Sequence, residues 1–344
     1  MLNKIIASEK IQKVKVYIDK GSKFVILTHE MPDGDAIGAS LGLYHYLMSY
    51  DKQSIKVVVP NAFPDFLKWM AGSADIVVFE QYPDFAQQLI AEADVIFCLD
   101  FNTVKRVGKL APALVVSDAR KVMIDHHLEP EPFSRVEISH PEACSSSELV
   151  FRLICRLGDL DLMEKEAAEC LYTGMMTDTG AFTFNSNNEN IYVIISELLK
   201  KGIDKDEIYR KVYQVFTESR LRLMGYVLYE KMKLYRNKKA ALFTLSREEL
   251  NHFRYKCGDT ETFVNLPLSI RGIQFSVFMR EERNCIKVSL RSSDNFPCNV
   301  FAAKFFNGGG HKNASGGEFY GTMGEAVKAF EEGLALLNPN NYEK

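Results

Sequence analysis

Short apolar runs alternate with longer amphipathic stretches through the first half of the chain. The runs at 24–28, 55–59, 95–99 and 122–124 are almost wholly hydrophobic and rich in Val and Ile, as strands are when a parallel sheet is covered on both faces. The stretches between them carry apolar residues at helical spacing, as at 37–48 and 84–91. This alternation predicts an α/β fold built on a doubly wound parallel sheet.

The hydrophobic pattern changes twice in the second half. Residues 145–234 are mostly amphipathic at helical spacing. The predicted helices there lie at 147–157, 164–176, 190–201 and 205–233. A mixed or antiparallel sheet, a glycine-rich loop and a last helix are predicted at 240–245, 274–279, 285–291, 307–317 and 324–337. We therefore predict an α/β domain at 1–190, a helical connector at 191–235 and a smaller α/β domain with a mixed sheet at 236–344.

Composition narrows the class of protein. The chain has 344 residues, 47% of them hydrophobic and 25% charged, as ordinary globular proteins have. A net charge of −3 gives no basic face for long duplex nucleic acid. The seven cysteines form no C-x-x-C pair, which favours reduced thiols and a cytoplasmic protein. The first 21 residues have the pattern of an amphipathic helix, not of a signal peptide, and no apolar run is long enough to span a membrane.

Acidic and histidine residues follow the predicted strands at their carboxyl ends. His29 comes directly after the first strand, Asp33 and Asp35 lie in the turn beyond it, and Asp100 directly follows the third. Ligand groups gather at this edge of doubly wound sheets. Two aspartates so close repel each other unless cations neutralise them. Taken separately, the turn is equally consistent with a solvated loop, and Asp100 is better explained as a helix cap.

A second set of residues makes a metal site the better explanation. Asp125, His126 and His127 are consecutive after a buried strand, an arrangement that is costly without a ligand. Asp178 follows a predicted helix. Residues that only capped separate helices would have no reason to share the ligand chemistry of one dinuclear site. In such a site, two metal ions activate water and stabilise the oxygens of a phosphoryl group. Carboxylate-rich ligation favours Mn²⁺ or Mg²⁺. The predicted ligands are His29, Asp33, Asp35, Asp100, His126 and Asp178.

Two features of the C-terminal domain have the chemistry of anion binding. The run GGGHKNASGG at 308–317 is dense in glycine, which allows close approach of backbone amides to an anion. The alternative for this run is a flexible connector. Arg291 ends a predicted strand of the same domain, and its planar guanidinium suits a phosphate. The alternative interpretation of Arg291 is an exposed arginine at the end of a strand.

The ordered motifs HEMPDGDAIGAS, LDFN, DHH, TDTGAF and GGGHKNASGG resemble those of the DHH–DHHA1 phosphoesterases over nearly the whole chain, and the layout is most similar to the nanoRNase and pAp-phosphatase subgroup. The resemblance implies that two metal ions share the six predicted ligands, with Asp100 bridging. It implies catalytic roles for Asp125, which orients the histidines, and for His127, which faces the scissile phosphate. It further implies that the substrate's far phosphate or nucleotide is bound by Arg291, Gly309, Gly310 and His311.

The expected function is therefore Mn²⁺-dependent hydrolysis, with Mg²⁺ as the alternative ion. The expected substrates are short single-stranded RNA and linear dinucleotides such as pApA, which yield mononucleotides, with 3′-phosphoadenosine 5′-phosphate (pAp) as a second substrate. Alternative functions are a cyclic di-AMP phosphodiesterase, an inorganic pyrophosphatase and a catalytically silent nucleotide-binding module. The sequence leaves open the ranking of substrates, the direction of digestion, the physiological metal and the oligomeric state, a dimer included.

Overall fold

The chain divides into two compact units. We analysed a computed structural model that describes residues 4–50, 52–256, 258–293 and 295–337. Unit 1 comprises Met1–Val215 and unit 2 comprises Phe216–Lys344. The division falls within the segment that the sequence predicts as a helical connector.

Unit 1 is built on a parallel sheet, as its hydrophobic pattern predicts. In the described part of the chain, six parallel strands lie in the order β3-β2-β1-β4-β5-β6. They are β1 (Lys23–Leu27), β2 (Ser54–Val59), β3 (Val77–Val78), β4 (Val95–Leu99), β5 (Arg120–Asp125) and β6 (Val136–Ser139). The central strand β4 is buried along its whole length. The prediction of a doubly wound parallel sheet is confirmed, with the short strands β3 and β6 added at its two edges.

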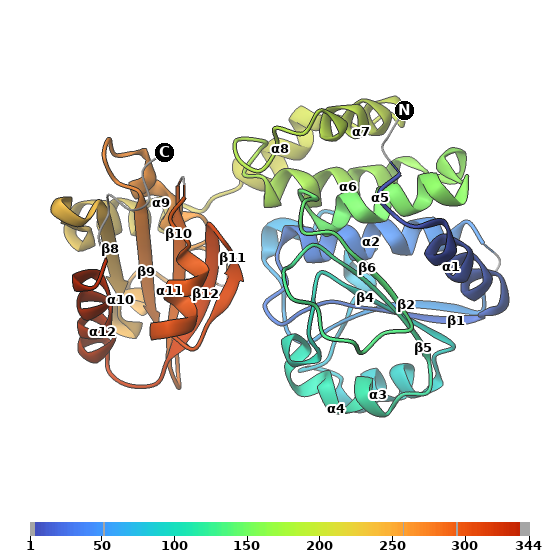
Figure 1. Cartoon of the computed structure of the whole chain (residues 1–344), viewed down its shortest axis with the longest axis horizontal. Helices are drawn as coiled ribbons and strands as arrows, with labels where there is room; N and C mark the ends of the chain where they lie inside the picture. Colours follow the sequence, from blue (N-terminus) through green and yellow to red (C-terminus); the bar gives the residue numbers. More distant parts are fainter. Residues whose placement is uncertain (1–3, 51, 257, 294, 338–344) are drawn as a thin grey trace. The chain divides into compact units, whose positions relative to one another are not determined.

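Helices cover both faces of this sheet (Figure 1). One face packs against α1 (Ser8–Lys20), α2 (Gly34–Met48), α5 (Ser146–Leu157) and α6 (Lys165–Asp178), and the other against α3 (Pro83–Glu92) and α4 (Ala111–Val116). Alternate residues of β1 serve the two cores, since Phe24 and Ile26 belong to the first and Val25 and Leu27 to the second. Two more helices, α7 (Glu189–Lys200) and α8 (Lys205–Tyr213), pack against α6.

Two helices of unit 1 approach each other unusually closely. A Cβ atom added to Gly38 of α2 would lie 2.6 Å from the Cys170 carbonyl oxygen and 2.8 Å from the Gly174 nitrogen, both in α6. Only glycine fits at that distance. This contact brings together the first turn of α2 and the last turn of α6, and each carries predicted metal ligands.

Unit 2 contains a mixed sheet, as predicted. Six described strands lie in the order β11-β12-β10-β9-β8-β7, where β8 and β9 are parallel and the other pairs are antiparallel. They are β7 (Lys233–Tyr235), β8 (Ala240–Leu245), β9 (Phe275–Glu281), β10 (Ile286–Ser292), β11 (Gly309–His311) and β12 (Ala314–Phe319). The helices are α9 (Glu218–Tyr226), α10 (Arg247–His252), α11 (Cys298–Phe305) and α12 (Met323–Ala335). Separate hydrophobic clusters cover the two faces of the sheet.

The structure differs from the predicted elements at two places. The glycine-rich segment predicted as a loop forms the hairpin β11–β12, in which Gly309 pairs with Gly316. Glycine is disfavoured in strands, so the sequence pattern does not predict a strand here. The two strands of this hairpin need residues without side chains, which is why glycine is found in them. The long amphipathic stretch predicted within the helical section at 205–233 is divided into α8, α9 and a π-helical turn at Val227–Lys231, followed by β7.

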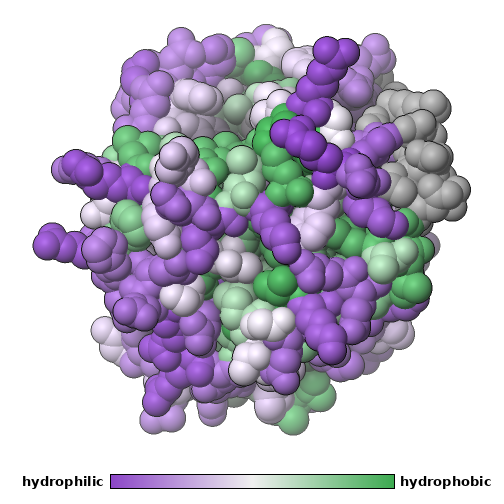
Figure 2. Space-filling view, turned by 90° about the vertical axis from the view of Figure 1, so that its left-hand side faces the viewer, coloured by the Kyte–Doolittle hydropathy of each residue, from purple (hydrophilic) through white to green (hydrophobic). Residues whose placement is uncertain are grey.

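The surface is predominantly polar on the face drawn in Figure 2, where hydrophobic residues lie among more numerous hydrophilic ones. None of the helices within the described ranges is long and apolar enough to cross a membrane.

Candidate metal centre

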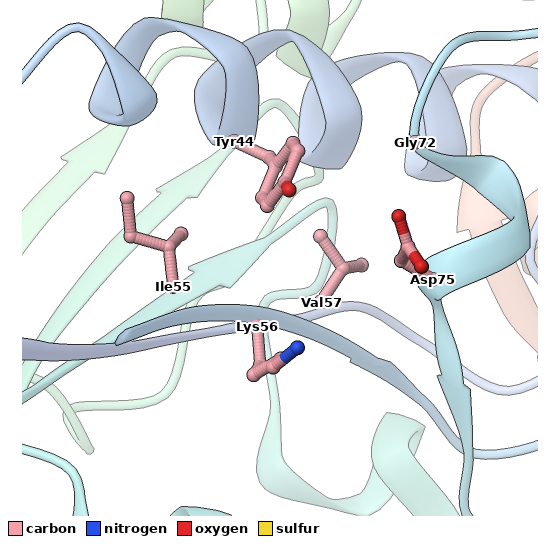
Figure 3. A pocket seen from close by; sticks show the side chains of 6 residues that line it. All are labelled: Tyr44, Ile55, Lys56, Val57, Gly72 and Asp75. Atoms are coloured by element: carbon pink, nitrogen blue, oxygen red, sulfur yellow. The ribbon is translucent and has the colours of Figure 1, made fainter. Parts of the chain in front are cut away.

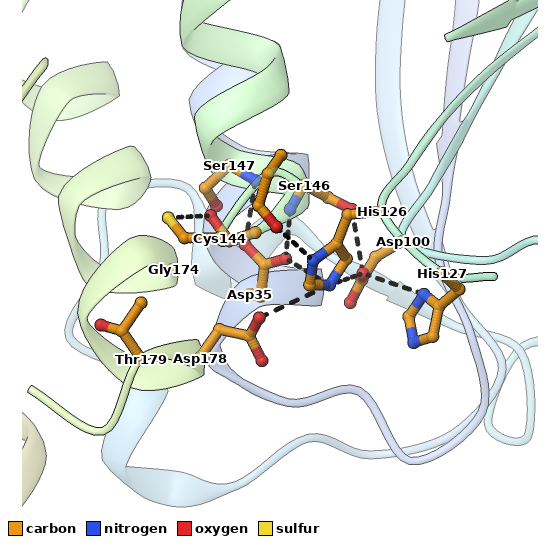
Figure 4. A network of polar contacts seen from close by, with 12 residues as sticks. Asp35, Asp100, His126, His127, Cys144, Ser146, Ser147, Gly174, Asp178 and Thr179 are labelled. Atoms are coloured by element: carbon orange, nitrogen blue, oxygen red, sulfur yellow. Dashed lines mark hydrogen bonds and ion pairs between the residues drawn. The ribbon is translucent and has the colours of Figure 1, made fainter. Parts of the chain in front are cut away.

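The predicted ligands of unit 1 meet at the carboxyl edge of the parallel sheet. The chain leaving β1 carries His29, that leaving β4 carries Asp100, and that leaving β5 carries His126. The N-terminus of α2 contributes Asp33 and Asp35, and Asp178 is the last residue of α6. Figure 4 shows Asp35, Asp100, His126 and Asp178 converging from these separate elements. Six residues that are distant in sequence therefore share one edge of the sheet.

Asp100 lies at the centre of this cluster. Its Oδ2 atom is 3.3 Å from Nε2 of His29, and its Oδ1 atom is 3.5 Å from Nε2 of His126. Its φ angle of 63° places it in the left-handed region that non-glycine residues rarely adopt. Such backbone strain is typical of functional sites. The two oxygens face different histidines, and this is the arrangement that a carboxylate bridging two cations requires.

Three groups of possible ligand atoms share Asp100, and two of them consist of predicted ligands alone. One consists of His29, Asp33 and Asp100, and the other of Asp35, Asp100 and His126; within each group the atoms lie within 4.8 Å of one another. Asp178 joins the second group, since its Oδ2 atom is 3.4 Å from Nε2 of His126. These acidic and histidine groups can hold metal ions at two adjoining positions.

The histidine contacts test whether a cation fits. Nδ1 of His29 lies 2.8 Å from the Glu30 carbonyl oxygen, and Nδ1 of His126 lies 3.2 Å from that of Ala143. A nitrogen that faces a carbonyl oxygen carries the proton, so Nε2 of each neutral ring presents its lone pair to carboxylate oxygens. A lone pair and a carboxylate repel each other unless a proton or a metal ion lies between them. Metal-binding histidines typically make this second contact to a carbonyl.

Burial and charge shift the pKa values of these groups in opposite directions. Burial, followed by the charges of Asp100 and Asp178, raises the pKa of Asp35 well above its usual value. Burial would also raise the pKa of Asp100, but the hydrogen bond and charges of the neighbouring histidines outweigh it and lower that pKa. Burial acts to lower the pKa of His126, yet the surrounding carboxylates raise it to about 9. The cluster is therefore a buried excess of negative charge that stabilises a cation.

The N-terminus of α5 holds two of the carboxylates in place. The main-chain N–H groups of Ser146 and Ser147 donate to Oδ2 and Oδ1 of Asp35, at 2.6 and 2.9 Å. The Ser146 hydroxyl donates to Oδ1 of Asp100 at 2.9 Å. These serines were not among the residues predicted from sequence. The available signal was the helix-start pattern Ser-Ser-Ser-Glu at 145–148, in which Ser145 caps α5 by accepting from the Glu148 N–H.

Asp125 and His127 form a separate pair beside the ligands. Oδ1 of Asp125 lies 2.7 Å from Nδ1 of His127, and Oδ2 accepts from the His127 main-chain N–H at 2.9 Å. Asp125 is fully buried. Burial lowers the pKa of His127, although Asp125 opposes the shift. Asp125 thus fixes the orientation of His127 and keeps the proton of its neutral ring on Nδ1.

The predicted substrate residues belong to unit 2. Arg291 lies in β10 and His311 in β11, and both pair in register with Ala314 of the intervening strand β12. Gly309 and Gly310 lie in β11, and Gly310 has a φ angle of 129°. The Arg291 guanidinium donates to the Leu290 carbonyl oxygen at 2.9 Å. The hairpin therefore places the predicted anion-binding residues on one edge of one sheet.

A small pocket of about 170 Å³ lies elsewhere in unit 1, between α2 and β2 (Figure 3). Its lining residues are Tyr44, Ile55, Lys56, Val57, Gly72 and Asp75. None of them is a predicted metal ligand. Tyr44 stands about 13 Å along α2 from Asp35, at a rise of about 1.5 Å per residue. The pocket is therefore separate from the metal centre.

The doubly wound sheet with its aspartate and histidine cluster, together with the second α/β unit, defines an enzyme of the phosphoesterase class. Residues 23–175 match the model of the DHH family, N-terminal domain, and residues 237–336 match that of the DHHA1 domain. The chain belongs to the DHH family and carries its DHHA1 domain.

Three known proteins are similar to this chain to different degrees. A bifunctional oligoribonuclease and PAP phosphatase, NrnA, from Thermus thermophilus is 30% identical over 86% of this chain and 84% of its own length. The crystal structure of an exopolyphosphatase-related protein from Bacteroides fragilis is 61% identical, with a TM-score of 0.92, over 97% of this chain and 98% of that one. RecJ from Thermus thermophilus, in complex with Mn²⁺, is 13% identical with a TM-score of 0.52 over 95% of this chain and 54% of its own, a likeness of fold alone.

Proposed function

We propose that the chain is a phosphodiesterase that uses two divalent cations, Mn²⁺ in the first place, to hydrolyse short oligoribonucleotides and linear dinucleotides to mononucleotides. Dephosphorylation of pAp would be a second activity of the same site. The observation that carries this proposal is the position of Asp100, whose two oxygens face His29 and His126 at 3.3 and 3.5 Å. The relative named oligoribonuclease and PAP phosphatase supports the choice of substrates.

Each predicted ligand has a role in this proposal. His29, Asp33 and Asp100 would hold one ion, and Asp35, Asp100, His126 and Asp178 the other. When bound, such a pair of ions activates a water molecule and stabilises the charge on phosphate oxygens. The main-chain N–H groups at the start of α5 keep Asp35 in position for that purpose.

His127 would act on the substrate through Nε2. Because Asp125 holds the proton of the neutral ring on Nδ1, the Nε2 lone pair is oriented to accept a hydrogen bond or a proton. The lowered pKa of His127 keeps the ring neutral near pH 7. We assign to His127 the position facing the scissile phosphate, and to Asp125 the orientation of that ring.

Unit 2 would recognise the remainder of the substrate, while unit 1 carries out the hydrolysis. We assign the far phosphate or nucleotide to Arg291, His311 and the amides of Gly309 and Gly310. Arginine suits a phosphate because its planar fork donates two parallel hydrogen bonds. Polyphosphate is a second candidate substrate, favoured by the name of the Bacteroides fragilis relative. It offers the same repeated phosphate chemistry without a base.

A single assay tests the proposal. The purified protein with Mn²⁺ is offered pApA, a pentanucleotide RNA, pAp, cyclic di-AMP, pyrophosphate and polyphosphate, beside an Asp125→Ala/His126→Ala double variant. We expect mononucleotide from pApA and RNA, and a loss of roughly 1,000-fold or more in the variant, because removing members of a catalytic unit costs about that much. Binding of a nucleotide with no release of product from any substrate would instead indicate a silent binding module.

A further inference from the structure

A half-buried arginine that the sequence motifs do not single out lies beside the metal centre. Arg106 belongs to the 3₁₀ segment Val104–Leu110, which begins four residues after Asp100. Its positive charge is close enough to act against protonation of His29 and His127, although the hydrogen bond and charge of Asp100 raise the pKa of His29 overall. Among the residues that the structure describes, its guanidinium forms no ion pair. An arginine in that position has a charge without a protein partner.

The backbone around Arg106 is fastened to the loop that carries His29. The Glu30 N–H donates to the Arg106 carbonyl oxygen at 2.7 Å. Two residues on, Gly108 has a φ angle of 52°, and the Glu30 carboxylate occupies the space that a Cβ atom at Gly108 would need. This close fit admits only glycine. Since Glu30 follows His29 directly, the fastening fixes Arg106 relative to the ligands.

The charges of the predicted ligands indicate a role for Arg106. Four of the predicted ligands are carboxylates: Asp33, Asp35, Asp100 and Asp178. Their four negative charges balance two divalent cations, and the histidine ligands are neutral when they bind metal. Arg106 and the buried carboxylate of Asp125 lie outside this balance, and Asp125 contacts His127 and not Arg106. A half-buried arginine that forms no ion pair of its own is stabilised when an anion binds beside it.

We propose that Arg106 binds the scissile phosphate, donating from its guanidinium to the non-bridging oxygens of the group that lies on the metal ions. This inference rests on the proposed phosphoesterase function and deepens it. Arg106 belongs to the same unit as the metal ligands, so its role differs from that of Arg291, which we assign to a more distant phosphate. Any substrate of this site has the group that Arg106 recognises, whatever its base.

The test compares Arg106→Ala and Arg106→Lys with Lys105→Ala, all loaded with Mn²⁺. Lys105 is the adjacent, exposed residue of the same turn, so it controls for loss of one positive charge. Three quantities are measured: Mn²⁺ affinity by calorimetry, the rise in Tm caused by inorganic phosphate, and kcat and KM on pApA. Guanidinium ion is then added to Arg106→Ala.

We expect the Mn²⁺ affinity to be unchanged in all three variants. Arg106→Ala should bind phosphate roughly 10- to 100-fold more weakly, as expected for loss of charge-assisted hydrogen bonds. Arg106→Lys should fall between, since an ammonium lacks the planar fork, and Lys105→Ala should match the unmodified protein. Guanidinium ion should restore part of the turnover of Arg106→Ala, which a purely structural role would not permit.

Three results would overturn the inference: phosphate binding by Arg106→Ala equal to that of the unmodified protein, an equal loss in Lys105→Ala, or a weakened Mn²⁺ affinity in Arg106→Lys. A different result would refute the proposed function. If the unmodified protein hydrolyses no substrate but its phosphate binding depends on Arg106, the anion site stands and the catalytic proposal does not.

Discussion

At the scale of single residues, the metal centre depends on donors that fix the direction of each carboxylate. Asp35 accepts two main-chain N–H groups from the start of α5, so both of its oxygens are oriented before any cation binds. Asp100 accepts a side-chain hydroxyl from Ser146. Outer contacts of this kind are typically worth 10- to 100-fold in metal affinity. Residues outside the ligand set therefore contribute to the site.

Two adjacent serines allow a sharp test of that idea. Ser146→Ala removes the hydroxyl that donates to Asp100, and we expect Mn²⁺ affinity to fall by roughly 10-fold. Ser147→Ala keeps the main-chain N–H that Asp35 accepts, and it removes a buried hydroxyl that has no hydrogen-bond partner among the described residues. It should bind Mn²⁺ as the unmodified protein does. Calorimetric titration of both variants measures the difference, and equal affinities would refute the role of Ser146.

At the scale of elements, the close contact of α2 and α6 sets the distance between ligands. Asp33 and Asp35 begin α2, and Asp178 ends α6. Gly38 and Gly174 allow the helices to meet without intervening side chains. Gly174 has a second neighbour, because a Cβ atom there would lie 2.9 Å from Oδ1 of Asp35. Helix packing and ligand geometry are therefore coupled through glycine.

Gly38→Ala should disturb both properties. Its Cβ would meet the backbone of α6, which cannot rotate away as a side chain can, so we expect a loss of about 1–3 kcal/mol in the free energy of unfolding. Mn²⁺ affinity should also fall, as α6 shifts with Asp178. Urea denaturation and metal titration measure the two effects.

Gly225→Ala is the matched control for that change. Gly225 lies in α9, and nothing lies within 4 Å of the position its Cβ would take. Alanine favours a helix over glycine by about 1 kcal/mol, so this variant should be as stable as the original or slightly more so. A loss in Gly225→Ala as large as that in Gly38→Ala would show that steric contact with α6 is not the cause.

Comparing the observed elements with the predicted ones shows which features the sequence reveals. Strands buried on both faces, such as β1 and β4, are evident as apolar runs, and their ends indicate where His29 and Asp100 lie. The hairpin β11–β12 is not evident, because glycine runs are typical of loops. Ser146 acts on Asp35 through its main-chain N–H, and the helix-start pattern at 145–148 indicates where a helix begins but not this contact with Asp35. Arg106 lies in an irregular turn, and its place beside His29 depends on a contact between two loops distant in sequence.

At the scale of the whole molecule, the chain consists of two units that each have their own core, and we propose that the chemistry is divided between them. Unit 1 encloses two hydrophobic clusters, one on each face of its sheet, and unit 2 encloses two others. Every predicted metal ligand lies in unit 1, as does Arg106, whereas Arg291 and His311 lie in unit 2. Metal binding and recognition of the far phosphate should therefore be separable experimentally.

A fragment of residues 1–215 tests that separation. Because it retains its sheet, both hydrophobic clusters and all six predicted ligands, we expect it to fold and to bind Mn²⁺ within about threefold of the affinity of the whole chain, a difference below about 1 kcal/mol. Its turnover of pApA should fall by at least about 100-fold, since the two side chains that we propose to bind phosphate are absent and each such contact contributes roughly 1.5–3 kcal/mol. Circular dichroism, calorimetry and product analysis measure these properties, with His126→Ala in the fragment as the control for the metal site. Loss of Mn²⁺ binding in a folded fragment would mean that unit 2 supplies a ligand, and undiminished turnover would remove Arg291 and His311 from the substrate site.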